Sequence, residues 1–503
     1  MTRKSLPLPA VGPADGPDGA AAPPLDHRQA AGDKAPSAPI SEAINEPTKE
    51  PIGAQSALPT ASLRSRSLKG GAWALGGFAA SKALRLASNL ILARFLAPEA
   101  FGVVAIAISL QIWLEMITDL GVNASVVREK AGDAPAFLDT AWTIQIVRNT
   151  AIASCLWIGA LFFPVLVSAA GVGAATVFAD PALPPIIAIV GVCVFVDGLR
   201  SMGFALCQRR LQLDRVVGLE LGAQVIATVA TISGAFAGLG VYALVLGMLT
   251  NAIAMAAGSY VFLGSGRRRI AITAEFRKTI ITYGKWLILA STLGFIINRG
   301  DQIIFGGLVV KEAFGLYAVA TIWITTLRAL FSVVQNKVAY PIFSELGRDR
   351  PEARTRIYYQ IRYGLDAASL AVFVGIVLFA KPVFGFIYPE AFASVADYVK
   401  LLSVGVLLFP YNLINTVILC AGDSKRFSGV VAAPGLAVFF GLPTVFHAAG
   451  FEAAIVFAAL VNVFAMPFMF WFARRLLTFR PLYEAGLVAA AFGAAIWTLG
   501  GLS

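Results

Sequence analysis

Apolar segments of membrane-spanning length follow one another along the chain from Leu68 onward. A helix needs roughly 20 predominantly apolar residues to cross the hydrocarbon core of a bilayer, and short polar gaps separate runs of this length. The pattern predicts twelve transmembrane helices in two sets of six, with a thirteenth at the carboxyl end. The expected helices are 70–94, 101–127, 141–169, 185–206, 217–238, 241–263, 285–307, 314–341, 363–388, 397–420, 428–447, 451–473 and 483–501.

The two sets of six are predicted to be copies of one unit. A shift of about 213 positions places Trp73 on Trp286, and the tetrad Glu-Ala-Phe-Gly at 99–102 on the same tetrad at 312–315. A repeat of this length indicates a duplicated helical bundle. The predicted fold class is therefore an all-α polytopic membrane protein with two homologous six-helix bundles plus a thirteenth, carboxyl-terminal helix.

Polar composition marks out the other segments. The first residues are rich in Pro, Ala, Gly and acidic residues and lack periodic apolar positions, which is typical of a disordered tail. The longest internal link has Ile272, Phe276 and Ile280 at four-residue spacing between cations, which predicts an amphipathic helix on the inner membrane surface. The expected segments are a disordered cytoplasmic tail at 1–66, an N-terminal lobe at 67–263, the linker at 264–284, a C-terminal lobe at 285–473 and the extra helix at 474–503.

Charge placement predicts the orientation in the membrane. Lys and Arg residues are concentrated in alternate gaps between the helices, and the intervening gaps are nearly free of them, so the positive-inside rule puts the amino terminus in the cytoplasm. A hydrophobic content of 58% and a mean hydropathy of +0.75 exclude a soluble fold. The net charge of +11 does not indicate a nucleic-acid partner, because the cations are not clustered on one polar face.

Residues for catalysis or metal binding are scarce. The four cysteines form no CxxC pair and there are only two histidines, so no metal site, disulfide or cofactor is expected. The chain has no GxxxxGK[ST] sequence, which excludes ATP hydrolysis as the driving force. External loops are very short and leave no room for a catalytic domain, so the protein is not expected to be an enzyme and no catalytic residue is assigned.

Charged residues inside the predicted helices are candidates for function, because ionisable groups at mid-membrane cost several kcal/mol and persist where they face a cavity or a partner. In the first helix, Lys82, Arg85 and Asn89 lie on one face. In the second helix, Glu115 and Asp119 form an acidic stripe. The short hinge makes these helices antiparallel neighbours, so Arg85 and Glu115 are expected to pair or to share a cavity wall.

The second half keeps the plan and changes the charges, since the repeat aligns Glu115 with Arg328. Arg148 of the third helix either faces the cavity or extends to the membrane interface. Two homologous bundles with charged faces at mid-membrane indicate an alternating-access transporter, and guanidinium groups favour a phosphate-bearing anion. The predicted substrate-binding residues are Lys82, Arg85, Asn89, Arg148, Arg299, Arg328 and Gln335, and the predicted ion-coupling or counter-ion residues are Glu115, Asp119 and Asp301.

The segments around the first hinge resemble a known family. The run RLASNLILARFLAPEAFG at 85–102, the Asp-Leu-Gly at 119–121 and FLDTAWT at 137–143 closely resemble the polysaccharide transport family of lipid-linked oligosaccharide flippases (Wzx-type). That family belongs to the multidrug/oligosaccharidyl-lipid/polysaccharide exporter superfamily. The resemblance implies a V-shaped, MATE-like bundle that opens inward and outward.

By the same resemblance, the substrate is an undecaprenyl-diphosphate-linked oligosaccharide, carried from the cytoplasmic to the periplasmic leaflet of the bacterial inner membrane for exopolysaccharide, capsule or O-antigen assembly. Cavity cations of such flippases hold the diphosphate, which implies that role for Lys82, Arg85, Arg148, Arg299 and Arg328. The implied partners are the lipid-linked oligosaccharide, membrane lipids, and a polysaccharide polymerase with its export machinery. The protein is expected to act as a monomer.

Two other functions remain open from the sequence. A proton- or sodium-coupled multidrug exporter of the same superfamily would need a site lined mainly by acidic and aromatic residues, whereas the deepest residues here are largely basic. A membrane polysaccharide polymerase or ligase would be expected to carry a large external loop with Arg or His residues, and the pattern contains no such loop.

Overall fold

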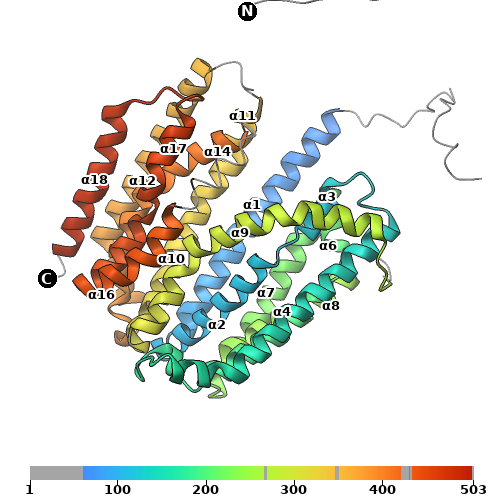
Figure 1. Ribbon diagram of the computed structural model, residues 1–503, viewed down its shortest axis with the longest axis horizontal. Coiled ribbons are helices and arrows are strands. Elements are labelled where there is room, and N and C mark those ends of the chain that lie inside the picture. Colours follow the sequence, from blue (N-terminus) through green and yellow to red (C-terminus); the bar gives the residue numbers. More distant parts are fainter. Residues whose placement is uncertain (1–59, 265–268, 346–350, 421–429, 431–432, 501–503) are drawn as a thin grey trace, which may run out of the picture. The chain divides into compact units, whose positions relative to one another are not determined.

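The structure is a computed structural model that describes residues 60–264, 269–345, 351–420, 430 and 433–500 (Figure 1). These residues are helical almost throughout, and the β pairing among them is an isolated bridge between Thr176 and Val310. The predicted tail at 1–66 lies outside the described residues as far as residue 59. Its last residues, 60–66, form the first turns of a helix.

The first bundle, coloured blue to green in Figure 1, contains the helices up to residue 262. Within it α7 packs on α8, α4 on α5, and α1 on α7. The elements are α1 (Thr60–Leu92), α2 (Pro98–Ile117), α3 (Val122–Arg128), α4 (Pro135–Ala169), the 3-10 turn η1 (Val177–Ala179), α5 (Leu183–Gly198), α6 (Gly203–Arg209), α7 (Leu213–Phe236) and α8 (Tyr242–Phe262).

The second bundle, coloured yellow to red, is also built of helices packed side by side. Helices α10 and α12 pack on α13, and α13 packs on α16. Its elements are α9 (Ala274–Leu308), α10 (Lys311–Val334), η2 (Gln335–Ala339), α11 (Tyr340–Glu345), α12 (Pro351–Ile387), η3 (Glu390–Phe392), α13 (Val395–Ser403), η4 (Val404–Tyr411), α14 (Asn412–Cys420), η5 (Ala437–Gly441), α16 (Leu442–Leu460), η6 (Val461–Ala465), α17 (Met466–Ala473) and α18 (Pro481–Gly500).

Each of the thirteen predicted segments overlaps a helix of the structure. Nine of the described helices are long and apolar enough to cross a membrane, or ten if the bent pair α5 and α6 forms one span. Helices α1 and α9 are not among these nine spans of the described chain. The stretch 433–473 contains two of the predicted helices, which join at Gly450, where the positive φ of 86° suits glycine.

The two Glu-Ala-Phe-Gly tetrads meet at the first turns of α2 and α10, which pack against each other. Helix α2 begins after extended Ala97, with Pro98 at its first position and Glu99 in the first turn, and both residues favour a helix start. A Cβ atom on Gly102 would lie 3.2 Å from the Cα of Gly315, and one on Gly315 would overlap the carbonyl oxygen of Pro98. The repeated glycines therefore let the two helices cross at backbone contact.

A cluster that we name the Lys311 latch joins the bundles at this crossing. The Lys311 ammonium lies 2.8 Å from a carboxylate oxygen of Glu99 and 3.5 Å from one of Asp180. The backbone N–H of Lys311 also donates to the carbonyl of Ala175 at 2.9 Å. Glu99, Asp180 and Ala175 belong to the first bundle and Lys311 to the second, so these contacts link the two bundles at the crossing.

The predicted linker at 264–284 continues without a break into the next helix, because α9 runs from Ala274 to Leu308. The ring of Phe276 packs edge-on against Phe137 of α4 at 5.2 Å, and Ile280 is fully buried in the same apolar cluster. Ile272 is exposed. Two of the three apolar positions of the linker therefore contact the first bundle. Residues 265–268 lie outside the described chain.

The last helix, α18, is attached to the second bundle by a buried polar network. Arg362 of α12 is fully buried, and its Nε donates to both carboxylate oxygens of Asp366 at 2.9 and 2.8 Å. From α18, the Tyr483 hydroxyl donates to Asp366 at 2.7 Å, and the Glu484 carboxylate accepts from the Tyr359 hydroxyl at 3.2 Å. The thirteenth helix is therefore bonded to the bundle interior as well as packed against it.

Candidate functional site

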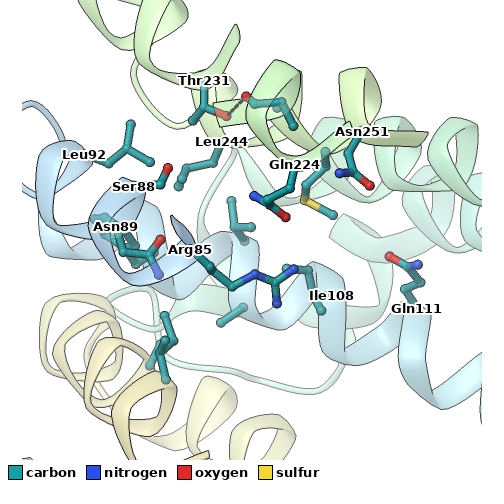
Figure 2. A pocket seen from close by; sticks show the side chains of 18 of the residues that line it. Arg85, Ser88, Asn89, Leu92, Ile108, Gln111, Gln224, Thr231, Leu244 and Asn251 are labelled. Atoms are coloured by element: carbon teal, nitrogen blue, oxygen red, sulfur yellow. Dashed lines mark hydrogen bonds between the residues drawn. The ribbon is translucent and has the colours of Figure 1, made fainter. Parts of the chain in front are cut away.

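A cavity of about 600 Å³ lies between the helices of the two bundles (Figure 2). Helices α1, α2, α5, α7 and α8 of the first bundle line it, together with α9 and α10 of the second. Of the ten predicted site residues, four line this cavity: Lys82, Arg85, Asn89 and Arg299. The spacing of Lys82, Arg85 and Asn89 on α1 thus places one polar face of this helix against the cavity.

The basic side of the cavity, which we call the cation wall, consists of Lys82 and Arg85 on α1 and Arg299 on α9. Figure 2 shows the Arg85 side chain extending from α1 into the cavity toward Ile108. Arg85 forms no hydrogen bond or ion pair in the described part of the chain, and it lies close enough to Arg299 for their charges to repel. Arg299 donates from Nη1 to the amide oxygen of Gln302 at 3.0 Å.

The acidic content of the cavity is small. Asp197 is the one carboxylate among the described lining residues, and it forms an ion pair with Arg200 at 3.2 Å. The Arg200 guanidinium therefore balances most of the negative charge of Asp197, and little of that charge is left to neutralise the cation wall. The cavity consequently has an excess of positive charge.

A hydrogen-bond chain at the edge of the cavity connects the two bundles. The buried Ser109 hydroxyl on α2 donates to the side-chain oxygen of Gln302 on α9 at 2.7 Å. The amide nitrogen of Gln302 donates in turn to the Thr321 hydroxyl on α10 at 3.3 Å. The sequence gives no signal for Ser109, because a single serine in an apolar helix most often bonds its own backbone, as Ser109 also does to Ala105.

Two predicted residues, Asp301 and Arg328, line a second, smaller cavity of about 60 Å³ within the second bundle. Arg328 donates to the side-chain oxygen of Asn298 at 2.8 Å, and its guanidinium lies 5.3 Å from the centroid of the Phe409 ring. Asp301 accepts a hydrogen bond from the Tyr317 hydroxyl. The structure therefore places both charges beside the main cavity, with partners of their own.

Arg148 terminates helix α2 and does not line the cavity. Its Nε donates to the carbonyl of Thr118 at 2.8 Å and its Nη2 to the carbonyl of Glu115 at 2.5 Å. The last carbonyls of a helix lack intrahelical partners and are negatively polarised, so a guanidinium is well suited to them. The position of a basic residue within a predicted membrane helix does not show whether its side chain binds a ligand or a helix end.

The remaining predicted residues do not line the cavity, and each has a partner within the protein. The Glu115 carboxylate accepts from the Gln111 amide at 2.9 Å, so the expected pair of Arg85 and Glu115 is not formed. The Asp119 carboxylate accepts from the backbone N–H of Gly121 at 2.9 Å in the turn after α2. Gln335 donates to the carbonyl of Phe409 at 3.2 Å. Glu115 and Asp119 lie outside the cavity because they are at the end of α2, where Arg148 and Asp119 bond the backbone of the last turn and the following loop.

The neutral polar residues opposite the cation wall were not predicted from the sequence. These are Gln224, Thr228 and Thr231 on α7 and Asn251 on α8. The three positions on α7 are spaced by four and three residues, which places them on one helical face. This spacing was the one feature of the sequence that could have identified the three residues. They are uncharged and lie among apolar neighbours, so they do not stand out as charged residues do.

Comparisons with known proteins relate this fold and cavity to others. Residues 91–397 match a family described as polysaccharide biosynthesis protein. The succinoglycan biosynthesis transport protein ExoT of Rhizobium meliloti (strain 1021) is 20% identical over 353 residues, covering 66% of this chain and 69% of that protein. A structure of the lipid II flippase MurJ in an inward closed conformation has a TM-score of 0.62 at 13% identity, covering 83% of this chain and 89% of that one. An inward-facing MATE family transporter has a TM-score of 0.60 at 16% identity, covering 78% and 94%.

The helical bundles and their central cavity define a multi-pass membrane protein with the fold of the multidrug/oligosaccharidyl-lipid/polysaccharide exporter superfamily. This confirms the predicted MATE-like fold class. Since the family match extends over more than half of the chain, the protein belongs to the polysaccharide biosynthesis protein family. The family resemblance noted in the sequence is confirmed by the same match.

Proposed function

We propose that the protein is a flippase that moves an undecaprenyl-diphosphate-linked oligosaccharide from the cytoplasmic to the periplasmic leaflet of the bacterial inner membrane. The observation that carries the proposal is the cation wall, in which Arg85 and Arg299 line one cavity and Arg85 has no acidic partner in the described chain. A buried cation without an acidic partner beside a second cation is stabilised by an anion. A diphosphate supplies two negative charges and oxygens that match the guanidinium donors.

Family membership supports a polysaccharide precursor as the cargo, since ExoT is described as a succinoglycan biosynthesis transport protein. A multidrug exporter for organic cations would need acidic groups in the cavity. The described lining offers only Asp197, which Arg200 already pairs. We also propose that the protein acts as a monomer and that its partners are a polysaccharide polymerase and the export machinery.

Alternating access would use the crossing of α2 and α10 as one gate. The charge distribution of the loops favours a cytoplasmic amino terminus and a periplasmic crossing end. With the Lys311 latch formed, the cavity would then be shut toward the periplasm. Binding of the lipid-linked anion would be followed by separation of the latch and release on the other side.

Replacing Arg85 or Arg299 by glutamine tests the proposal. We expect each variant to bind undecaprenyl diphosphate about tenfold to a hundredfold less tightly, because a hydrogen bond to a charged group contributes about 1.5–3 kcal/mol. Binding is measured on the purified protein by native mass spectrometry, and export by the lipid-linked oligosaccharide that accumulates in cells. Arg94→Gln is the matched control, since Arg94 is exposed and does not line the cavity. Binding and export in Arg85→Gln equal to those of the control would refute the cation wall as the diphosphate site.

Replacing Lys311 by alanine tests the gate. The Lys311 and Glu99 side chains are 40% and 37% exposed, so we expect a stability loss of less than about 1 kcal/mol. Labelling of a cysteine introduced at the cavity residue Ser88 by an impermeant maleimide from the periplasmic side should increase, because the closed state loses its inter-bundle ion pairs. Lys381→Ala is the control, because the Lys381–Asp397 pair lies within one bundle. Unchanged labelling in Lys311→Ala would show that the latch does not hold the gate.

A further inference from the structure

The neutral polar side of the cavity carries no positive charge to neutralise a diphosphate. Gln224, Thr228 and Thr231 of α7 and Asn251 of α8 form this side, which we call the amide wall. Figure 2 shows Gln224 and Asn251 projecting into the space that Arg85 enters from α1. The two walls thus face one cavity from different helices.

The amide wall keeps hydrogen-bonding capacity free. Asn251 forms no side-chain hydrogen bond in the described part of the chain, and Gln224 makes only a long contact of 3.5 Å to the Thr228 hydroxyl. Thr231, in contrast, donates to the carbonyl of Ala227 at 2.8 Å, so its donor is already used. Free amides this deep in a membrane protein require water or a ligand as partners.

The chemistry of these groups selects a class of ligand. A carboxamide donates and accepts hydrogen bonds, and so does a sugar hydroxyl, whereas an organic cation or an acyl chain offers at most one of these functions. The wall contains no charged residue, so it offers an ion no opposite charge. A cavity with a cation wall and an amide wall fits an anionic group joined to a neutral polyhydroxylated group.

We propose that Gln224, Thr228 and Asn251 bind the glycan of the lipid-linked substrate, at the sugar joined to the diphosphate. This inference rests on the proposed function, because the diphosphate at Arg85 and Arg299 places the sugar beside the amide wall. The cation wall then provides affinity for any polyprenyl diphosphate. The amide wall provides the preference for a particular glycan.

The test uses the double variant Gln224→Leu/Asn251→Leu and two probes: undecaprenyl diphosphate, and the lipid-linked oligosaccharide extracted from a strain that lacks this gene. Native mass spectrometry measures the affinity of each probe. Wild type should bind the oligosaccharide lipid more tightly than the bare lipid. The double variant should lose about tenfold of this preference, as two amide hydrogen bonds would provide, and should bind the bare lipid as wild type does.

Thr250→Val is the matched control, because Thr250 is next to Asn251 but bonds the carbonyl of Leu246 and does not line the cavity. Retention of the wild-type preference in the double variant would overturn the amide-wall proposal and leave the flippase proposal standing. Wild-type protein that binds neither probe, or binds both independently of Arg85, would overturn the proposed function itself. Binding of the bare lipid by the double variant shows that it is folded, and the single variants Gln224→Leu and Asn251→Leu give the same comparison if the double variant does not fold.

Discussion

The Arg362→Met variant is expected to lose about 3–5 kcal/mol of stability, because it leaves buried carboxylates without their cation. Asp366 and Glu484 are 7% and 5% exposed, and both belong to the network around Arg362. The Arg362 guanidinium also lies 3.7 Å from the centroid of the Tyr411 ring, so its removal opens a gap in the packing. Loss of the network should release α18 from the second bundle.

The geometry predicts an order among the neighbouring variants. Asp366 accepts two hydrogen bonds from Arg362 and one from Tyr483, so Asp366→Asn should destabilise clearly. Glu484 lies 3.8 Å from Arg362 without a hydrogen bond to it, and the carboxylate oxygen nearest Arg362 has no hydrogen-bond partner in the described structure. Removing this charge relieves desolvation at little loss of pairing, so Glu484→Gln should be the mildest of the three.

Thermal unfolding of the purified variants in detergent measures this order, with protease sensitivity of the 474–480 connection as the readout for release of α18. Arg362→Lys is the control for charge, since it keeps the cation and loses the planar donor pair. It should fall between wild type and Arg362→Met. Equal melting temperatures for Arg362→Met and Glu484→Gln would contradict a network organised around the arginine.

The helices of this protein were predictable because lipid-exposed and buried faces are both apolar, so length and hydropathy mark each span without tertiary information. The same property hides which face of a helix meets which neighbour. The continuous α9 shows this, since Phe276 and Ile280 are equally suited to a lipid surface and to the Phe137 cluster that they contact. Periodicity identified the apolar face and left its partner open.

The candidate site was predictable only in part, for a similar reason. Lys82, Arg85 and Asn89 line the cavity as expected, because three polar residues on one face of a membrane helix require a polar environment. Arg148 met that requirement with helix carbonyls and Arg328 with Asn298. A charged residue near the middle of a predicted membrane helix thus needs a partner. Only the packing shows whether this partner is part of the protein or a ligand.

The crossing of the two repeats leaves no room for a side chain at Gly315. Gly315→Ala is expected to disrupt the closed gate, because the new methyl group would overlap the backbone carbonyl of Pro98, which cannot rotate away. Overpacking of this kind costs about 1–3 kcal/mol, which corresponds to a shift of about fivefold to more than a hundredfold in a two-state equilibrium. In the proposed alternating-access cycle the two bundles separate at this crossing in the open state, so the equilibrium should move toward that state.

The duplicated glycine supplies the matched control. A methyl group on Gly102 would lie 3.0 Å from a ring carbon of Phe314 and 3.2 Å from the backbone of Gly315, distances that a small displacement relieves. Gly102→Ala should therefore keep most of the export activity, while Gly315→Ala loses it. Periplasmic labelling of a cysteine at Ser88 should increase far more in Gly315→Ala than in Gly102→Ala. If both variants export and label alike, then the close contact of the tetrads is a packing feature of the fold, and the gate lies elsewhere in the bundle.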